Sequence, residues 1–338
     1  MQYSLLNRFR GALLGSVIGE ILGNGGCQGL VLDGSSLQNP KLVDNQSDKT
    51  ISPWHQIAVC GTKSLISYGR LDLEDWLLQI SLRQSSLLKF KNAAVSSEVA
   101  LATIPIVLFF HEDEAKLRQL LLQAAAIWQN NIKSQAVATE EAWVFEGVLA
   151  IAFAIALALT EKLNPSTLIS QTLAYLGTTQ TPMVKQLAEV QTLLEQGVGL
   201  SIALKQLRQA QSSLYSDLPK EQLPQSKPHN CPYTSIALAF YCFLSTPEDF
   251  RLGVTRAVRT GYQPQTTAAL TGALSGVYNS IIDIPVGWRL AAKNISTGLE
   301  NWQLAKYLLA TWLGVYDLSV TQHYQRLTVA APRVIQRR

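Results

Sequence analysis

The chain has 338 residues, of which 47% are hydrophobic and 15% charged, and its formal net charge is +4. Soluble domains usually carry about 25% charged residues, so this composition indicates a large core of helices covered by other helices. The small net charge, with no basic stripe interleaved with aromatic residues, argues against a nucleic-acid partner, and Arg333, Arg337 and Arg338 form only a short basic tail.

The cysteines show no metal-binding spacing. Cys27, Cys60, Cys231 and Cys242 form no CxxC pair, and none of the 4 histidines is placed to complete a Cys/His zinc set. We therefore expect free thiols in a reducing compartment.

Two apolar runs have to be distinguished from targeting or membrane segments. Residues 11–23 follow two arginines, as in a signal peptide, but Glu20 interrupts the run and no clean cleavage site follows. Residues 147–159 are apolar throughout, yet the run is shorter than the roughly 20 residues that span a bilayer. We expect a soluble, cytoplasmic protein without a membrane partner.

Apolar residues recur at three- and four-residue spacing along most of the chain, which is typical of amphipathic helices. No alternating β-branched run is long enough for a sheet, so the sequence predicts an all-α fold. The predicted helices span residues 4–22, 55–69, 73–90, 97–110, 114–130, 140–161, 165–176, 182–195, 199–212, 233–245, 247–259, 265–281, 287–296 and 300–314.

Capping residues mark several predicted helix starts. Asp72 precedes one helix, Asn164 and Pro165 open another, and Thr246 before Pro247 gives a capping hydroxyl and a first-turn proline to a third.

Glycines on two predicted helices recur every four residues. Gly11, Gly15 and Gly19 form one strip near the start of the chain, and Gly272 with Gly276 forms another near its end. Glycine inside a helix costs about 0.5–1 kcal/mol relative to alanine, so such a strip indicates that another backbone approaches closely. We expect the two strips to pack together at the centre of one domain.

Loops are predicted at residues 23–52, 214–232 and 317–338. The proline-rich stretch 214–232 could link two domains, but the helical pattern resumes unchanged after it. We therefore predict a single domain over residues 1–338, with 214–232 as an excursion and 317–338 as a tail.

Two segments resemble signature sequences of the ADP-ribosylglycohydrolase family, whose fold removes ADP-ribose from modified proteins. The first, RFRGALLG, starts at Arg8 and is followed by a turn from Gly19 to Gly23. The second, GYQPQTTAA, starts at Gly261 and continues through GALSG to IPVGWR, which ends at Arg289. The resemblance implies a single large helical domain.

The resemblance also implies a two-magnesium site, and this chain departs from the family at the ligand positions. Glu20 replaces the aspartate of the first turn. Where the family has Thr-Asp-Asp-Thr, this chain has Ser52, Pro53, Trp54 and His55. Proline and tryptophan side chains cannot ligate a hard cation.

The second half of the implied metal site is also altered. The match to the family's Gly-Asp-x-Asp-Thr is Gly261, Gln263, Gln265 and Thr266, so both acids have become amides. The family's Gly-x-Gly loop would fall at Ser96, Ser97 and Glu98, where both glycines are absent. Magnesium requires several charged oxygen ligands, so we expect no metal cofactor here.

We therefore expect a protein of this fold that has lost dimetal hydrolysis. It would bind a small molecule or a partner protein at the cleft between residues 52–56 and 261–267, which we call the old cleft. Its site residues would be Glu20, Ser52, Trp54, His55, Tyr262, Gln263, Gln265 and Thr266, with the two aromatic rings as stacking surfaces and the amides as neutral hydrogen-bonding groups.

Two alternatives remain open. An active hydrolase would hold magnesium through unaligned acids such as Glu20, Asp44, Asp48 and Glu98, and a helical scaffold would have no small-molecule site because Trp54 and its neighbours fill the cleft.

Two further groups of side chains have ordinary interpretations. His55 could act as a base but is expected to cap a helix, and Glu140, Glu141 and Glu146 are expected to place favourable charge at a helix N-terminus.

Overall fold

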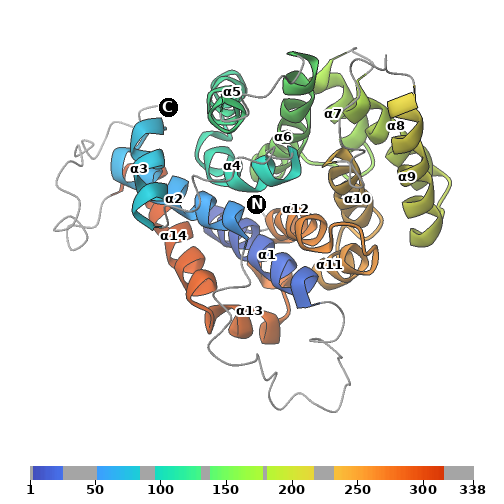
Figure 1. Ribbon diagram of the computed structural model, residues 1–338. Helices are drawn as coiled ribbons and strands as arrows, with labels where there is room; N and C mark the ends of the chain where they lie inside the picture. Colours follow the sequence, from blue (N-terminus) through green and yellow to red (C-terminus); the bar gives the residue numbers. More distant parts are fainter. Residues whose placement is uncertain are drawn as a thin grey trace.

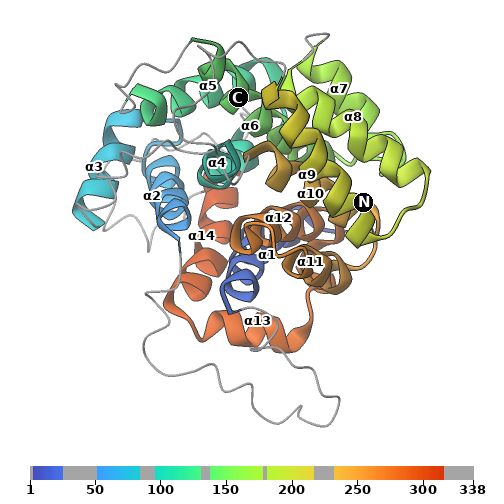
Figure 2. The same cartoon turned by 45° about the vertical axis from the view of Figure 1, so that its right-hand side comes forward.

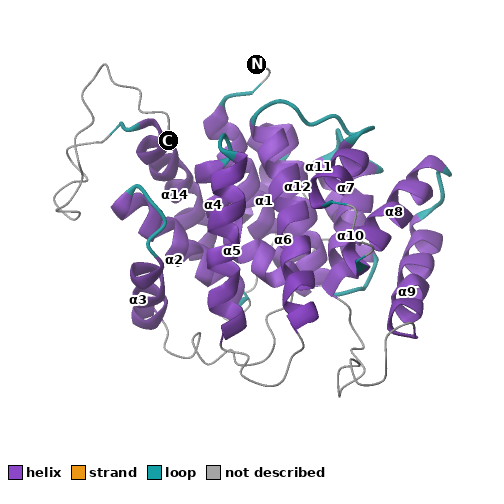
Figure 3. Cartoon of the chain, turned by 90° about the horizontal axis from the view of Figure 1, so that it is seen from above, coloured by secondary structure: helices purple, strands orange, loops and turns teal. Residues whose placement is uncertain are grey.

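The computed structural model describes residues 3–25, 52–83, 96–130, 138–177, 181–216 and 232–315. Within these residues every regular element is an α-helix, which confirms the predicted all-α fold (Figure 3). The helices are α1 (Leu5–Gly25), α2 (Pro53–Tyr68), α3 (Leu73–Arg83), α4 (Ser96–Phe110), α5 (Glu114–Asn130), α6 (Ala138–Leu159), α7 (Leu168–Leu176), α8 (Pro182–Glu195), α9 (Leu200–Ser216), α10 (Pro232–Leu244), α11 (Phe250–Arg259), α12 (Pro264–Asp283), α13 (Val286–Lys293) and α14 (Ser296–Leu313).

The packing of α1 against α12 dominates the centre of the molecule, and the other helices surround this pair (Figures 1 and 2). A Cβ atom on Gly11 would collide with the carbonyl oxygen of Gly276, and one on Gly15 would collide with that of Gly272. Gly19 lies equally close to the backbone of Ala268. The predicted close approach of the two glycine strips is confirmed.

This contact joins opposite ends of the chain, and the surrounding core is strongly apolar. Phe9, Phe109, Phe240 and Phe250 are among the largest fully buried side chains, and they come from helices α1, α4, α10 and α11. Burial of apolar surface on this scale is the main stabilising contribution to a helical fold. The arrangement supports our proposal that the chain forms one domain.

Two predicted helix starts are too early. α11 begins three residues later than predicted, because Asp249 accepts a hydrogen bond from the Leu252 amide at 2.8 Å while the Thr246 hydroxyl donates to the Cys242 carbonyl. α7 also begins later, since the Asn164 carboxamide accepts hydrogen bonds from Ser166 within the preceding turn.

α14 begins at Ser296, four residues earlier than predicted, and α13 ends at Lys293, three residues earlier than predicted. At α3, the Asp72 carboxylate caps the helix by accepting a hydrogen bond from the Asp75 amide at 3.0 Å, as predicted. α9 continues through residues 214–216, where a loop was predicted, and most of the predicted loops and the tail lie outside the described residues. In the described part of the chain, no helix is both long and apolar enough to cross a membrane.

Candidate functional site

Three segments predicted to form the site meet at one corner of the α1–α12 pair: the end of α1, the start of α2 and the start of α12. Gly23 in the last turns of α1 packs directly on the backbone of Pro264 and Gln265 at the start of α12. The Ser52 amide, just before α2, donates a hydrogen bond to the Glu20 carboxylate of α1. We call this region the α1/α2/α12 corner.

Glu20 and His55 form a buried pair at this corner. The Nδ1 atom of His55 lies 2.7 Å from Oε2 of Glu20, and the two side chains are 4% and 2% exposed. Burial alone would raise the pKa of Glu20, but the hydrogen bond and the charge of His55, together with hydrogen bonds from Ser52, outweigh this and lower the pKa below its ordinary value. Both carboxylate oxygens are therefore already engaged.

Ser52, not His55, caps helix α2. Its backbone is extended (φ −63°, ψ 152°), and its hydroxyl accepts a hydrogen bond from the His55 amide at 3.4 Å. Pro53 takes the first helical position, where a missing N–H costs nothing. The predicted capping role of His55 is wrong because its imidazole points to Glu20, a residue 35 positions earlier.

The amides at the start of α12 are also engaged. Gln263 adopts a left-handed conformation (φ 38°, ψ 59°), and its side-chain carbonyl accepts a hydrogen bond from the Ser235 hydroxyl of α10. Gln265 donates from its amide to Asn24 of α1. Thr266 is half-buried in the first turn. These contacts fasten the start of α12 to both α1 and α10.

The two aromatic residues predicted as stacking surfaces are buried. Trp54 is 3% exposed and Tyr262 is 5% exposed, and both belong to the hydrophobic core. The Tyr262 carbonyl accepts a hydrogen bond from the Thr267 hydroxyl at 2.7 Å, which fixes the turn before α12. Neither ring therefore presents a free face to a ligand, contrary to the expectation from sequence.

Three buried polar atoms were not predicted as candidate site atoms. Among the described residues, Ser97 Oγ, Glu146 Oε2 and Gln186 Oε1 are buried without a hydrogen-bond partner. Burial raises the pKa of Glu146, and a hydrogen bond from Thr181 opposes the shift. Buried polar atoms without partners are uncommon and frequently mark binding or catalytic positions.

The position of Glu146 in the structure differs from the one expected from the sequence. α6 starts at Ala138, so Glu146 lies well beyond the first turn, and its predicted role as a helix N-terminal charge is wrong. A Cβ atom on Gly147 would collide with Ser96 of α4 and Ile236 of α10, so α4, α6 and α10 meet here. The side chains of Glu140 and Glu141 lie outside the described residues.

Comparisons with known proteins identify the class. Residues 1–317 match the family model described as ADP-ribosylglycohydrolase, so the chain belongs to the ADP-ribosylglycohydrolase family. A solved structure described as "ADP-ribosylglycohydrolase-related protein complex" is similar with a TM-score of 0.59 at 18% sequence identity, over 91% of this chain and 99% of that chain. At this identity the similarity shows the fold alone. No curated protein gives a significant sequence match.

The donors at the α1/α2/α12 corner do not fit the two magnesium ions that the family implies. The oxygens of Glu20 are bonded to His55 and Ser52, and the side-chain oxygen of Gln263 is bonded to Ser235. Pro53 and Trp54 offer no side-chain oxygen. Two divalent ions without several carboxylates would leave their charge uncompensated.

The alternative set of acids is only partly described. Asp44 and Asp48 lie outside the described residues, and Glu98 is half-buried in the first turn of α4. Across the part of the chain that the structure covers, no three His, Cys, Asp or Glu side chains gather in a group that could hold a metal ion.

Proposed function

We propose that this member of the ADP-ribosylglycohydrolase family does not catalyse dimetal hydrolysis and acts instead as a binding or regulatory protein. The Glu20–His55 pair is the observation that carries the proposal. An imidazole 2.7 Å from the carboxylate supplies the hydrogen bond that the buried carboxylate needs, so this acid already has a partner other than a cation. Adding magnesium would require this pair to separate.

The ligand that suits such a site is uncharged or weakly anionic. The groups around the start of α12 are amides and hydroxyls, namely Gln263, Gln265, Thr266 and Ser235, and hydrogen bonds to neutral groups set orientation without demanding charge.

A second function is favoured by the burial of Trp54 and Tyr262. If these rings fill the old cleft, the chain is a helical protein that binds a macromolecular partner and has no small-molecule site. Both rings are packed in the hydrophobic core, and this is the arrangement that such a protein would have.

An assay with an ADP-ribosylated protein and free adenosine separates these functions. We expect no release of ADP-ribose, with or without magnesium, and a rise in the melting temperature with adenosine, an uncharged part of ADP-ribose, that a chelator leaves unchanged. Gln265→Ala should reduce the rise, whereas Gln171→Ala, on an exposed residue of α7, should not. Chelator-sensitive release would overturn the proposal, and the absence of any rise would favour the partner-binding protein.

A further inference from the structure

Two basic side chains lie over one indole ring where α1, α13 and α14 pack together, and a third lies near one of them. The guanidinium carbon of Arg10 lies 4.2 Å from the centroid of the Trp302 ring, and the Lys293 ammonium lies 3.4 Å from it. Arg289, one turn before Lys293 on α13, is close enough to act on Lys293 electrostatically. We call Arg10, Arg289, Lys293 and Trp302 the basic cluster.

No carboxylate neutralises the basic cluster within the part of the chain that the structure describes. None of its three cations forms an ion pair with a described residue. The Nε atoms of Arg10 and Arg289 are in addition buried and have no hydrogen-bond partner there. Buried donors on charged groups usually find partners, and among the described residues both open donors accompany unpaired charges, whereas Arg8, whose Nε is also open, forms an ion pair with Glu161.

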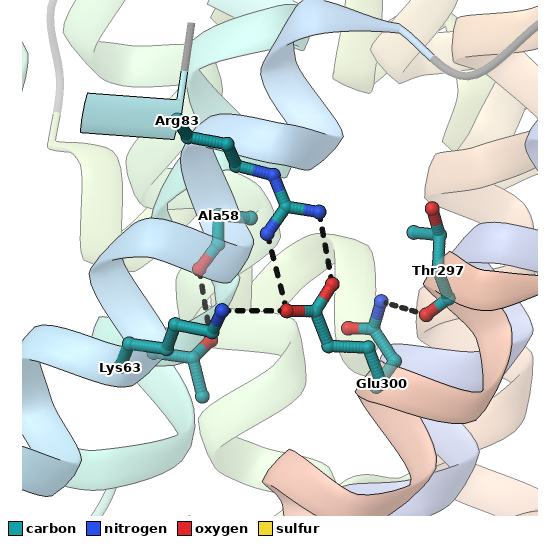
Figure 4. Close-up of polar contacts among 7 residues, drawn as sticks. Ala58, Lys63, Arg83, Thr297 and Glu300 are labelled. Atoms are coloured by element: carbon teal, nitrogen blue, oxygen red, sulfur yellow. Dashed lines mark hydrogen bonds and ion pairs between the residues drawn. The ribbon is translucent and has the colours of Figure 1, made fainter. Parts of the chain in front are cut away.

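The nearest acid along α14 is already engaged elsewhere. Glu300, two residues before Trp302, forms a pair of hydrogen bonds with Arg83 at 3.1 and 2.9 Å and an ion pair with Lys63 at 2.7 Å. Figure 4 shows its carboxylate reaching from α14 to Lys63 of α2 and Arg83 of α3. Two cations thus share one acid on that side of α14, while the basic cluster has none.

Like charges gathered in this way repel one another. Partial burial lowers the pKa of Lys293, and the charges of Arg10 and Arg289 lower it further. The attraction of Arg10 and Lys293 to the indole ring is weak and leaves the positive charge in place. An anion bound among the three side chains would relieve the repulsion and satisfy the open Nε donors.

Close backbone contacts fix the points at which Arg10 and Lys293 are attached. Arg10 directly precedes Gly11, where α1 is in close contact with α12, and Lys293 directly follows Ala292, whose carbonyl lies against Gly298 of α14. Backbones this close cannot shift without collision. A site whose groups are already in place loses little conformational freedom on binding.

We propose that the basic cluster is a binding site for a small phosphate-bearing anion. Guanidinium groups present paired N–H donors that match phosphate oxygens, and an ammonium group adds a compact charge, so two arginines and a lysine suit a multiply charged phosphate. Arg10 lies about 15 Å along α1 from Glu20 at 1.5 Å per residue, so the site is separate from the α1/α2/α12 corner.

Calorimetric titration with inorganic tripolyphosphate at low ionic strength tests the proposal. We expect one tripolyphosphate bound per chain, and an affinity at least about tenfold lower for Arg10→Gln/Lys293→Gln, because two charge-assisted contacts are lost. The matched control Lys205→Gln removes a charge from an exposed residue of α9 and should change the affinity less than about twofold.

Thermal unfolding provides the readout that a purely structural role would not give. Tripolyphosphate should raise the melting temperature of the wild-type protein and leave that of Arg10→Gln/Lys293→Gln unchanged. ADP tests the source of the phosphate: binding as tight as that of tripolyphosphate would assign the site to nucleotides, and weaker binding would assign it to free oligophosphates. Absence of tripolyphosphate binding, or equal weakening by Lys205→Gln, would overturn the proposal.

Discussion

The carboxylate of Glu20 is held ionised by its neighbours although it is almost completely buried. His55 and Ser52 lower its pKa against the opposing effect of burial. A carboxyl whose pKa is lower in the folded than in the unfolded state stabilises the protein above the unfolded pKa of about 4.3, and this contribution is lost as the pH falls through the folded pKa.

Glu20→Gln should therefore make the free energy of unfolding less dependent on pH in the acidic range. The free energy of unfolding of the wild-type protein should fall as the pH drops below about 4.5, and the variant should fall less steeply over the same interval. At neutral pH the variant should be less stable by about 3 kcal/mol, because His55 loses its buried partner. Urea denaturation across this pH range measures both effects.

Glu112→Gln serves as the control, since Glu112 is exposed and forms no ion pair with a described residue. If Glu20→Gln keeps the wild-type dependence on pH, the carboxylate is not held ionised by His55.

At the level of single residues, the sequence indicated which positions lack the family's acids. It did not indicate which contacts the residues at these positions make instead. Pairing of His55 with Glu20 depends on side-chain directions across 35 residues of chain, and local patterns carry no such information. Ser52 next to Pro53 is a capping signal that could have been recognised locally, and it would have excluded His55 as the cap.

Among the helices, α1 and α12 are held at a separation that only glycine permits. Gly15 and Gly272 each lie where a Cβ atom would collide with the backbone of the other helix. Substitution there cannot be relieved by a change of side-chain rotamer, so the helices would have to move apart. The close contact therefore fixes how the start of α12 lies against the end of α1, where the candidate site is formed.

Gly15→Ala should lower the free energy of unfolding by at least about 3 kcal/mol, the upper part of the range for overpacked cores. Gly25→Ala, in the same helix, has no atom within 4 Å of the added Cβ and should leave stability within about 1 kcal/mol of the wild type. Chemical denaturation of both variants measures the difference. Equal effects of the two substitutions would contradict the close packing of α1 on α12.

Element positions followed well from periodicity, because apolar spacing reports which face of a helix is buried. The errors at α7 and α11 have a common cause, because in both a proline was taken as the first helical residue. The cap of α11 is Asp249, which lies after the proline, and a turn that includes the proline precedes α7. Local propensity could not distinguish a proline in the first turn from one in the preceding loop.

At the scale of the whole molecule, the family and the helical fold were predictable from two short motifs near the ends of the chain. The match over residues 1–317 and the packing of α1 on α12 agree with that prediction. The unpartnered polar atoms of Ser97, Glu146 and Gln186 were not predictable, because they lie on three different helices, α4, α6 and α8, and the burial of one side-chain oxygen leaves no local pattern in the sequence.

Metal binding tests the central claim most directly. The purified protein is dialysed against Mg²⁺ and, in parallel, titrated with Mn²⁺ while the free ion is followed by electron paramagnetic resonance. We predict no stoichiometric metal in the dialysed protein and no saturable Mn²⁺ binding, because the carboxylate of Glu20 is committed to His55 and the other positions lack acids. Two divalent ions retained per chain, and lost on substitution of Glu20, would contradict the account.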